Sequence, residues 1–181
     1  MGKIIEIDNF VDLNQQLEII NYININKNLP YLFHTSCVAF KQFKPTKNTI
    51  DYPLVIYPIF SENKIQDNYL FSCVYNMLHK NKLSNNFIER IKININFPYP
   101  NNSKEKYGPI HTDRKENGIS IIYYINDTDG DTVFFDKKLN VVKRVSPKQG
   151  KAIIFDSTIP HAGSCPINSK YRQNINFVLY K

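Results

Sequence analysis

The N-terminal half of the chain carries two hydrophobic stripes at helical spacing. Asp12 is a suitable N-cap for the first stripe, which predicts a helix that runs to about Ile25. The second stripe follows Ser61 and ends near Lys82. Hydrophobic residues at this spacing normally fill a core, so we predict two supporting helices without a chemical role. The stripe positions are Leu13, Leu17, Ile20 and Ile23 in the first helix, and Ile65, Leu70, Val74, Met77 and Leu78 in the second.

From Glu89 onward the hydrophobic period becomes two, which is the period of a strand with two distinct faces. In the first such strand, Arg90, Lys92, Asn94 and Asn96 alternate with Ile91, Ile93, Ile95 and Phe97. Turn signals such as Asn117-Gly118 separate the β-rich runs that follow. Many short strands with regular turns indicate a sandwich or a barrel. The later runs are residues 119–126, 132–136, 141–145, 151–156 and 172–180.

The two halves are expected to form one domain, because 181 residues without a linker or an internal repeat suit a single core. We predict an α+β double-stranded β-helix (jelly-roll) whose N-terminal helices pack on one sheet. The helices belong to a support region of about residues 1–88, and the β core covers about residues 89–181. Residues 34–60 carry three prolines and are predicted to form extended segments and loops.

The composition is that of a globular protein, with 42% hydrophobic and 22% charged residues. No segment approaches the roughly 18 apolar residues needed to cross a bilayer, so no membrane association is expected. Cys37, Cys73 and Cys165 match neither a disulfide framework nor a zinc pattern, which favours a reducing, cytoplasmic environment. The net charge of +7 is spread along the chain. It predicts a solvated basic surface, and the alternative is attraction to an acidic partner or to nucleic acid, although no nucleic-acid-binding motif accompanies the charge.

The strongest chemical signal is His111-Thr112-Asp113, followed 50 residues later by His161. In a strand, residues i and i+2 point to the same face, so His111 and Asp113 can present an imidazole and a carboxylate side by side. A second imidazole from a distant strand would complete three facial ligands. Two histidines and one carboxylate are typical of non-haem iron(II) oxygenases. The three-residue pattern alone is weak, but an apolar strand precedes His161 and Arg172 opens the last strand, which makes the combination informative.

Residues 89–181 resemble the catalytic core of Fe(II)/2-oxoglutarate-dependent dioxygenases of the prolyl 4-hydroxylase-like family. In two respects this chain departs from the family pattern. Asp129-Gly130 replaces a pair of glycines, and the basic residue of the last strand lies a position or two further on, which leaves Lys170 as an alternative to Arg172. The strand phase favours Arg172. The matching motifs are His111-Thr112-Asp113, Tyr124-Ile125-Asn126, Gly130-Asp131-Thr132, Pro147-Lys148-Gln149-Gly150, His161-Ala162-Gly163 and Arg172.

The resemblance implies that His111, Asp113 and His161 are the catalytic iron ligands. It also implies that Arg172 binds the distal carboxylate of 2-oxoglutarate and that Tyr124 donates its hydroxyl to the same group. Tyr123 should then point the other way.

Two asparagines of the last strand are further candidates for the site. Asn174 and Asn176 share a face with Arg172, and amides facing an apolar barrel are costly unless they are hydrogen-bonded. We therefore expect Asn174 or Asn176 near the co-substrate or the substrate.

The function implied by the resemblance is hydroxylation of a C–H bond with Fe(II), 2-oxoglutarate and dioxygen, supported by ascorbate. Asp113 argues against halogenation, because related halogenases have a small residue in place of the carboxylate. Three alternatives remain at this point: a hydroxylase of a free amino acid or other small molecule, a non-catalytic metal-binding jelly-roll protein, and a zinc hydrolase that uses the same ligands.

The preferred primary substrate is a prolyl residue in a polypeptide. Besides the resemblance, residues 34–60 mix aromatic and basic side chains that could contact an extended chain with acidic flanks. An ordinary loop that covers the sheet is the alternative interpretation of this segment. The side chains in question are Phe40, Phe43, Tyr52 and Tyr57, with Lys41, Lys44 and Lys47.

Overall fold

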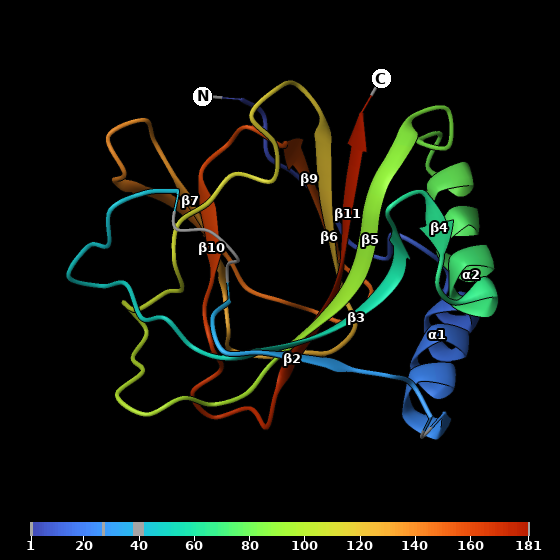
Figure 1. Cartoon of the computed structure of the whole chain (residues 1–181), viewed down its shortest axis with the longest axis horizontal. Helices are drawn as coiled ribbons and strands as arrows, with labels where there is room; N and C mark the ends of the chain where they lie inside the picture. The colour runs from blue at the N-terminus through green and yellow to red at the C-terminus, as the bar shows by residue number, and fades with distance from the viewer. Residues whose placement is uncertain (1, 27, 38–41, 181) are drawn as a thin grey trace.

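The computed structural model describes residues 2–26, 28–37 and 42–180 and contains two antiparallel sheets and two helices (Figure 1). The helices are α1 (Leu13–Ile25) and α2 (Asn68–Lys80). The strands are β1 (Ile5–Ile7), β2 (Leu32–His34), β3 (Leu54–Ser61), β4 (Lys64–Ile65), β5 (Phe87–Asn96), β6 (Ile119–Tyr124), β7 (Thr132–Phe135), β8 (Val141–Val145), β9 (Ala152–Asp156), β10 (His161–Gly163) and β11 (Arg172–Tyr180).

The large sheet has the strand order β1-β9-β6-β11-β5-β3-β2, and β4 pairs with β3. The small sheet has the order β10-β7-β8. Both helices cover one face of the large sheet, on the right in Figure 1, and the small sheet lies on the opposite side. This arrangement is a double-stranded β-helix core with supporting helices, so the predicted fold class is confirmed.

The period-two pattern of the sequence determines which side chains face each layer. In β6, Ile121 and Tyr123 pack in the core beneath the helices, whereas Ile122 and Tyr124 pack between the two sheets. Tyr123 and Tyr124 therefore point in opposite directions, as predicted. β5 and β11 repeat the alternation, but there the face that looks toward the small sheet is polar.

Asp12 caps α1 as predicted, but the prediction that Leu13 and Leu17 belong to its buried stripe is wrong. Leu13 and Leu17 are 61% and 43% exposed. The buried face contains Gln16 instead, whose side-chain amide donates a 3.0 Å hydrogen bond to the backbone carbonyl of Val11. A glutamine can replace a leucine on the buried face because its polar group is satisfied there.

The second helix begins later than the sequence pattern predicted. Ile65 lies in β4 and is exposed, so it is not part of the helical stripe. Asp67 caps α2 by accepting a 2.9 Å hydrogen bond from the backbone N–H of Leu70. The same carboxylate accepts hydrogen bonds from the hydroxyls of Tyr22 and Tyr57, at 3.1 and 2.9 Å. The remaining predicted positions of the stripe are buried: Leu70, Val74, Met77 and Leu78.

The proline-containing segment 34–60 includes part of a regular strand. β3 runs through Pro58 and pairs with β5, and the register shifts between Pro58 and Phe60. A bulge of this kind is where a strand tolerates a proline. Neither α1 nor α2 is long and apolar enough to cross a membrane, and the described residues contain no other candidate span.

Candidate metal centre

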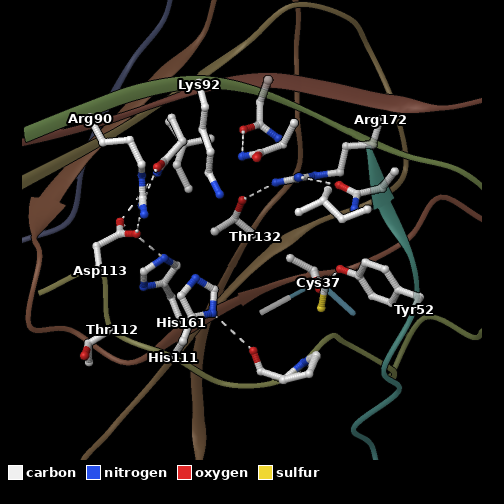
Figure 2. A pocket seen from close by; sticks show the side chains of 18 of the residues that line it. Cys37, Tyr52, Arg90, Lys92, His111, Thr112, Asp113, Thr132, His161 and Arg172 are labelled. Carbon is white, nitrogen blue, oxygen red and sulfur yellow. Dashed lines mark hydrogen bonds and ion pairs between the residues drawn. The ribbon is translucent and has the colours of Figure 1, made fainter. Parts of the chain in front are cut away.

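His111, Asp113 and His161 converge at one end of a cavity between the sheets (Figure 2). One potential ligand atom from each residue lies within 4.8 Å of the other two. The expectation that His111 and Asp113 share a regular strand is wrong. His111 forms an isolated β-bridge with His161, and the backbone N–H of Asp113 donates a 3.0 Å hydrogen bond to the carbonyl of Ser157. Local backbone pairing thus holds the side chains together without a long strand.

Both imidazole rings are oriented by backbone carbonyls. Nδ1 of His111 lies 3.2 Å from the carbonyl oxygen of Pro109, and Nδ1 of His161 lies 2.9 Å from that of Ile159. An Nδ1–H that donates to a carbonyl leaves the lone pair on Nε2, the tautomer that binds a metal. Burial lowers the pKa of His111 to about 3, so its ring is neutral at physiological pH.

The carboxylate of Asp113 is held from several sides. Its Oδ2 accepts a 2.6 Å hydrogen bond from the hydroxyl of Ser120, and its Oδ1 lies 3.1 Å from Nη2 of Arg90. Burial by itself raises the pKa of Asp113, but the two histidines, Arg90 and Ser120 together lower it to about 2. Two oriented imidazoles and an ionised carboxylate are a donor set that fits iron(II).

Arg172 lies across the cavity from these three residues and is 4% exposed. Its guanidinium donates hydrogen bonds to the carbonyl of Gly130 at 2.8 Å, to Oδ1 of Asn96 at 3.2 Å and to the hydroxyl of Thr132 at 2.9 Å. All three partners are neutral, and no carboxylate within the described ranges forms an ion pair with Arg172. A buried cation of this kind fits a carboxylate ligand. Lys170 is exposed and does not line the cavity.

Tyr124 lies behind Thr132 rather than on the cavity wall. Its hydroxyl donates a 2.7 Å hydrogen bond to Oγ1 of Thr132, the same atom that accepts from Arg172. Burial raises the pKa of Tyr124 to about 12, so the phenol stays protonated. Thr132 was not predicted to have a role, although it belongs to the motif Gly130-Asp131-Thr132.

The cavity has a volume of about 350 Å³ and is lined mainly by polar and charged residues. Both asparagines expected near the site line it: Asn176 accepts a 3.2 Å hydrogen bond from Arg90, and Asn174 accepts one of 3.2 Å from Asn94. The contribution of β5 was not predicted from the sequence, although the polar positions of its period-two pattern were visible. Those cavity-lining residues of β5 are Arg90, Lys92, Asn94 and Asn96.

The segment 34–60 borders this cavity. Gln42 exchanges hydrogen bonds with the backbone of Thr112: its amide donates to the carbonyl at 3.0 Å, and its carbonyl accepts from the backbone N–H at 2.9 Å. Tyr52 lines the cavity and donates a 2.8 Å hydrogen bond to the carbonyl of Gly163. Gln42 therefore contacts the segment that contains His111 and Asp113, and Tyr52 contacts the strand that begins at His161.

The proposed aromatic surface of this segment is only partly present. The prediction that Tyr57 contacts the substrate is wrong, because Tyr57 is buried beneath the helices and its hydroxyl donates a hydrogen bond to Asp67. Phe43 packs against a hydrophobic cluster of the small sheet. Phe40 and Lys41 lie outside the described residues.

Comparison with known proteins agrees with this geometry. Residues 99–180 match the family model of the 2OG-Fe(II) oxygenase superfamily. No curated protein sequence matches the chain significantly.

Solved structures with the same fold cover nearly the whole chain. A 2OG-Fe(II) oxygenase family oxidoreductase from Burkholderia pseudomallei has a TM-score of 0.70 at 13% identity, over 98% of this chain and 84% of its own. A prolyl-4-hydroxylase from Pseudomonas putida has a TM-score of 0.65 at 13% identity, over 100% and 94%. The non-haem, α-ketoglutarate-dependent epimerase SnoN from nogalamycin biosynthesis has a TM-score of 0.65 at 7% identity, over 99% and 79%. The family match covers the β core and the solved structures share the fold, so both agree with the resemblance to 2OG-Fe(II) oxygenases found in the sequence.

Proposed function

We propose that this protein is an Fe(II)- and 2-oxoglutarate-dependent hydroxylase in which His111, Asp113 and His161 hold the iron. One observation carries the proposal: the three residues share a cavity with Arg172, a buried cation that has no carboxylate partner among the described residues. When bound, iron(II) and 2-oxoglutarate supply the oxidising chemistry, in which 2-oxoglutarate, dioxygen and a C–H bond become succinate, carbon dioxide and a C–OH group. Ascorbate is expected to support the reaction.

In this proposal, Arg172 orients the co-substrate. Its planar guanidinium can make parallel charged hydrogen bonds to the distal carboxylate, which a lysine could not make. Thr132 presents its hydroxyl beside the guanidinium and can contact the same carboxylate. Tyr124 then acts through Thr132, because its hydroxyl fixes the position of the threonine oxygen.

The other side chains of the site keep the metal ligands in their binding forms. The carbonyls of Pro109 and Ile159 hold the two imidazoles, and Ser120 and Arg90 hold the carboxylate of Asp113. Such outer contacts normally change metal affinity or activity by 10- to 100-fold. They also prevent the ligands from rotating away before a metal binds.

For the primary substrate we propose a prolyl residue in a polypeptide. The prolyl-4-hydroxylase fold supports this choice, and residues 42 and 52 border the cavity where an extended chain would pass. The similarity to the epimerase supports the alternative, a small molecule. At 13% and 7% identity, both similarities concern the fold, so the substrate has to be tested directly.

The test compares substrates at a fixed supply of Fe(II), 2-oxoglutarate and ascorbate. We expect Pro-containing peptides to stimulate succinate formation, with one oxygen atom added to the peptide for each succinate formed. Free proline and other free amino acids should not stimulate it. Stoichiometric hydroxylation of a free amino acid, with every peptide inert, would overturn the choice of substrate and leave the oxygenase proposal standing. An Asp113→Ala variant serves as the control for metal-independent succinate formation.

A further inference from the structure

Lys92 occupies a position in the cavity that the proposed function does not explain. It lies on β5, and its amine points into the cavity between Asp113 and Arg172 (Figure 2). Within the part of the chain that the structure describes, Lys92 makes no side-chain hydrogen bond and no ion pair. A lysine directed into a cavity without a partner is costly unless a ligand supplies the opposite charge.

The charges of the cavity favour an additional anion. Among the described residues that line the cavity, Arg90, Lys92 and Arg172 contribute positive charge and Asp113 alone contributes negative charge. The charge of iron(II) and that of the 2-oxoglutarate dianion cancel one another. A loaded site would therefore keep two more positive than negative charges. In a partly enclosed cavity, such an excess attracts a negatively charged group.

The other two cations already have counterparts. Arg90 lies 3.1 Å from Asp113 and also donates a hydrogen bond to Asn176. Arg172 is the cation that fits the distal carboxylate of the co-substrate. Lys92 is therefore the one cavity cation among the described residues with neither an observed nor a proposed partner.

The register of the large sheet places Lys92 at the metal end of the cavity. Lys92 pairs with Asn176, whereas Arg172 pairs with Asn96. The backbone of Lys92 thus lies four residues along the sheet from that of Arg172, or about 13 Å at about 3.3 Å per residue. A group bound by Lys92 would lie beside Asp113, near the place where a substrate C–H bond must approach.

We propose that Lys92 binds a carboxylate of the primary substrate and so selects substrates with an acidic group close to the reacting carbon. This inference rests on the proposed function and narrows its substrate class. The carboxylate has two possible sources: an acidic side chain next to the target residue in a peptide, or the α-carboxylate of a free amino acid. Both present the same chemistry to the lysine ammonium.

The test uses matched probes that differ only in charge. Gly-Glu-Pro-Gly is compared with Gly-Gln-Pro-Gly, and free proline with prolinamide. Each is titrated by calorimetry into protein loaded with Mn(II) and 2-oxoglutarate under anaerobic conditions. We expect the wild-type protein to bind the carboxylate member of at least one pair about tenfold or more tightly than its amide. The pair that shows the preference identifies the source of the carboxylate.

Three variants test whether the preference for the carboxylate probe depends on Lys92. Lys92→Gln should remove it, Lys92→Arg should retain most of it, and Lys137→Gln, at an exposed lysine outside the cavity, should leave it unchanged. Circular dichroism verifies that each variant is folded.

The inference is overturned if no pair discriminates in the wild type, or if Lys92→Gln keeps the preference. It is also overturned if Lys92→Gln weakens 2-oxoglutarate binding as much as it weakens probe binding, because the lysine would then serve the co-substrate. Titration of 2-oxoglutarate alone into the Mn(II)-loaded wild type tests the proposed function separately. Binding of 2-oxoglutarate without discrimination between the probes would contradict only the inference about Lys92.

Discussion

Arg172 and Lys170 differ in burial, and this difference gives a direct test of the co-substrate site. Replacing Arg172 with alanine removes a buried cation that makes three hydrogen bonds. It also removes the proposed partner of the distal carboxylate of 2-oxoglutarate. We expect 2-oxoglutarate binding to weaken by about 3–5 kcal/mol. Lys170→Ala should have no measurable effect, because Lys170 is exposed outside the cavity. Calorimetric titration of both variants with 2-oxoglutarate measures the two affinities. A larger loss of affinity in Lys170→Ala would show that Lys170, and not Arg172, binds the distal carboxylate.

Tyr124 and Thr132 should affect the co-substrate unequally. Tyr124→Phe removes one buried hydrogen bond to the threonine and should weaken 2-oxoglutarate binding by about 1–2 kcal/mol. Thr132→Val removes the hydroxyl that lines the cavity, so its effect should be at least as large. The affinities of the two single variants provide the comparison. A much larger effect from Tyr124→Phe would mean that the phenol contacts the co-substrate directly.

Lys92 should reduce the stability of the protein when no ligand is bound. Burial and the nearby Arg90 lower the pKa of Lys92 to about 8, below the ordinary value of 10.5. The unfolded chain therefore binds more protons between about pH 8 and 10.5, and stability should rise with pH across this window. Lys92→Met should remove that rise. At pH 7 it should also raise Tm by roughly 2–4 °C, the change that corresponds to about 1 kcal/mol in a chain of this size.

Thermal unfolding without metal, at several pH values, measures both effects of Lys92→Met. An unchanged pH profile together with a lower Tm would show that the lysine is stabilised by the protein itself. In that case the ammonium would have no need of a ligand.

At the scale of elements, Asp67 should matter more than the other helix cap, Asp12. Asp67 is buried, caps α2 and accepts two tyrosine hydroxyls, so Asp67→Ala should cost about 2–4 kcal/mol of unfolding free energy. Asp12 also caps a helix, but it is exposed and its carboxylate contacts Lys80 at the surface. Asp12→Ala should therefore cost clearly less. Urea unfolding of both variants tests this order, and equal losses would contradict it.

The elements also show what a hydrophobic pattern can predict. The β core was predicted almost to its boundaries, because alternation in β5, β6 and β11 reports directly on two faces with different environments. The buried face of α1 was not predicted, because Gln16 is satisfied by a carbonyl outside the helix. β10 was also missed, because its three residues are strand only through pairing with β7.

At the scale of the whole molecule, the sequence motif predicted the residues with the most specific chemistry. His111, Asp113 and His161 could be proposed as iron ligands from the sequence, because few residue types bind iron. Arg90 and Lys92 were not, since a charged residue on a period-two strand is usually solvated. Only the fold, which places β5 beside β11 and opposite the segment with His111 and Asp113, shows that this polar face is enclosed.

Our main proposal is that His111, Asp113, His161 and Arg172 form one site for Fe(II) and 2-oxoglutarate. It is tested most directly by the visible absorption of the protein after anaerobic addition of both. We expect a weak absorption band in the wild type that requires the metal and the co-substrate together. Asp113→Ala and His111→Ala should lack the band while keeping the circular dichroism of the folded protein, and Arg172→Ala should need far more 2-oxoglutarate to develop it. A wild type without the band, or an Asp113→Ala variant that retains it with full iron affinity, would show that these residues do not form the proposed site.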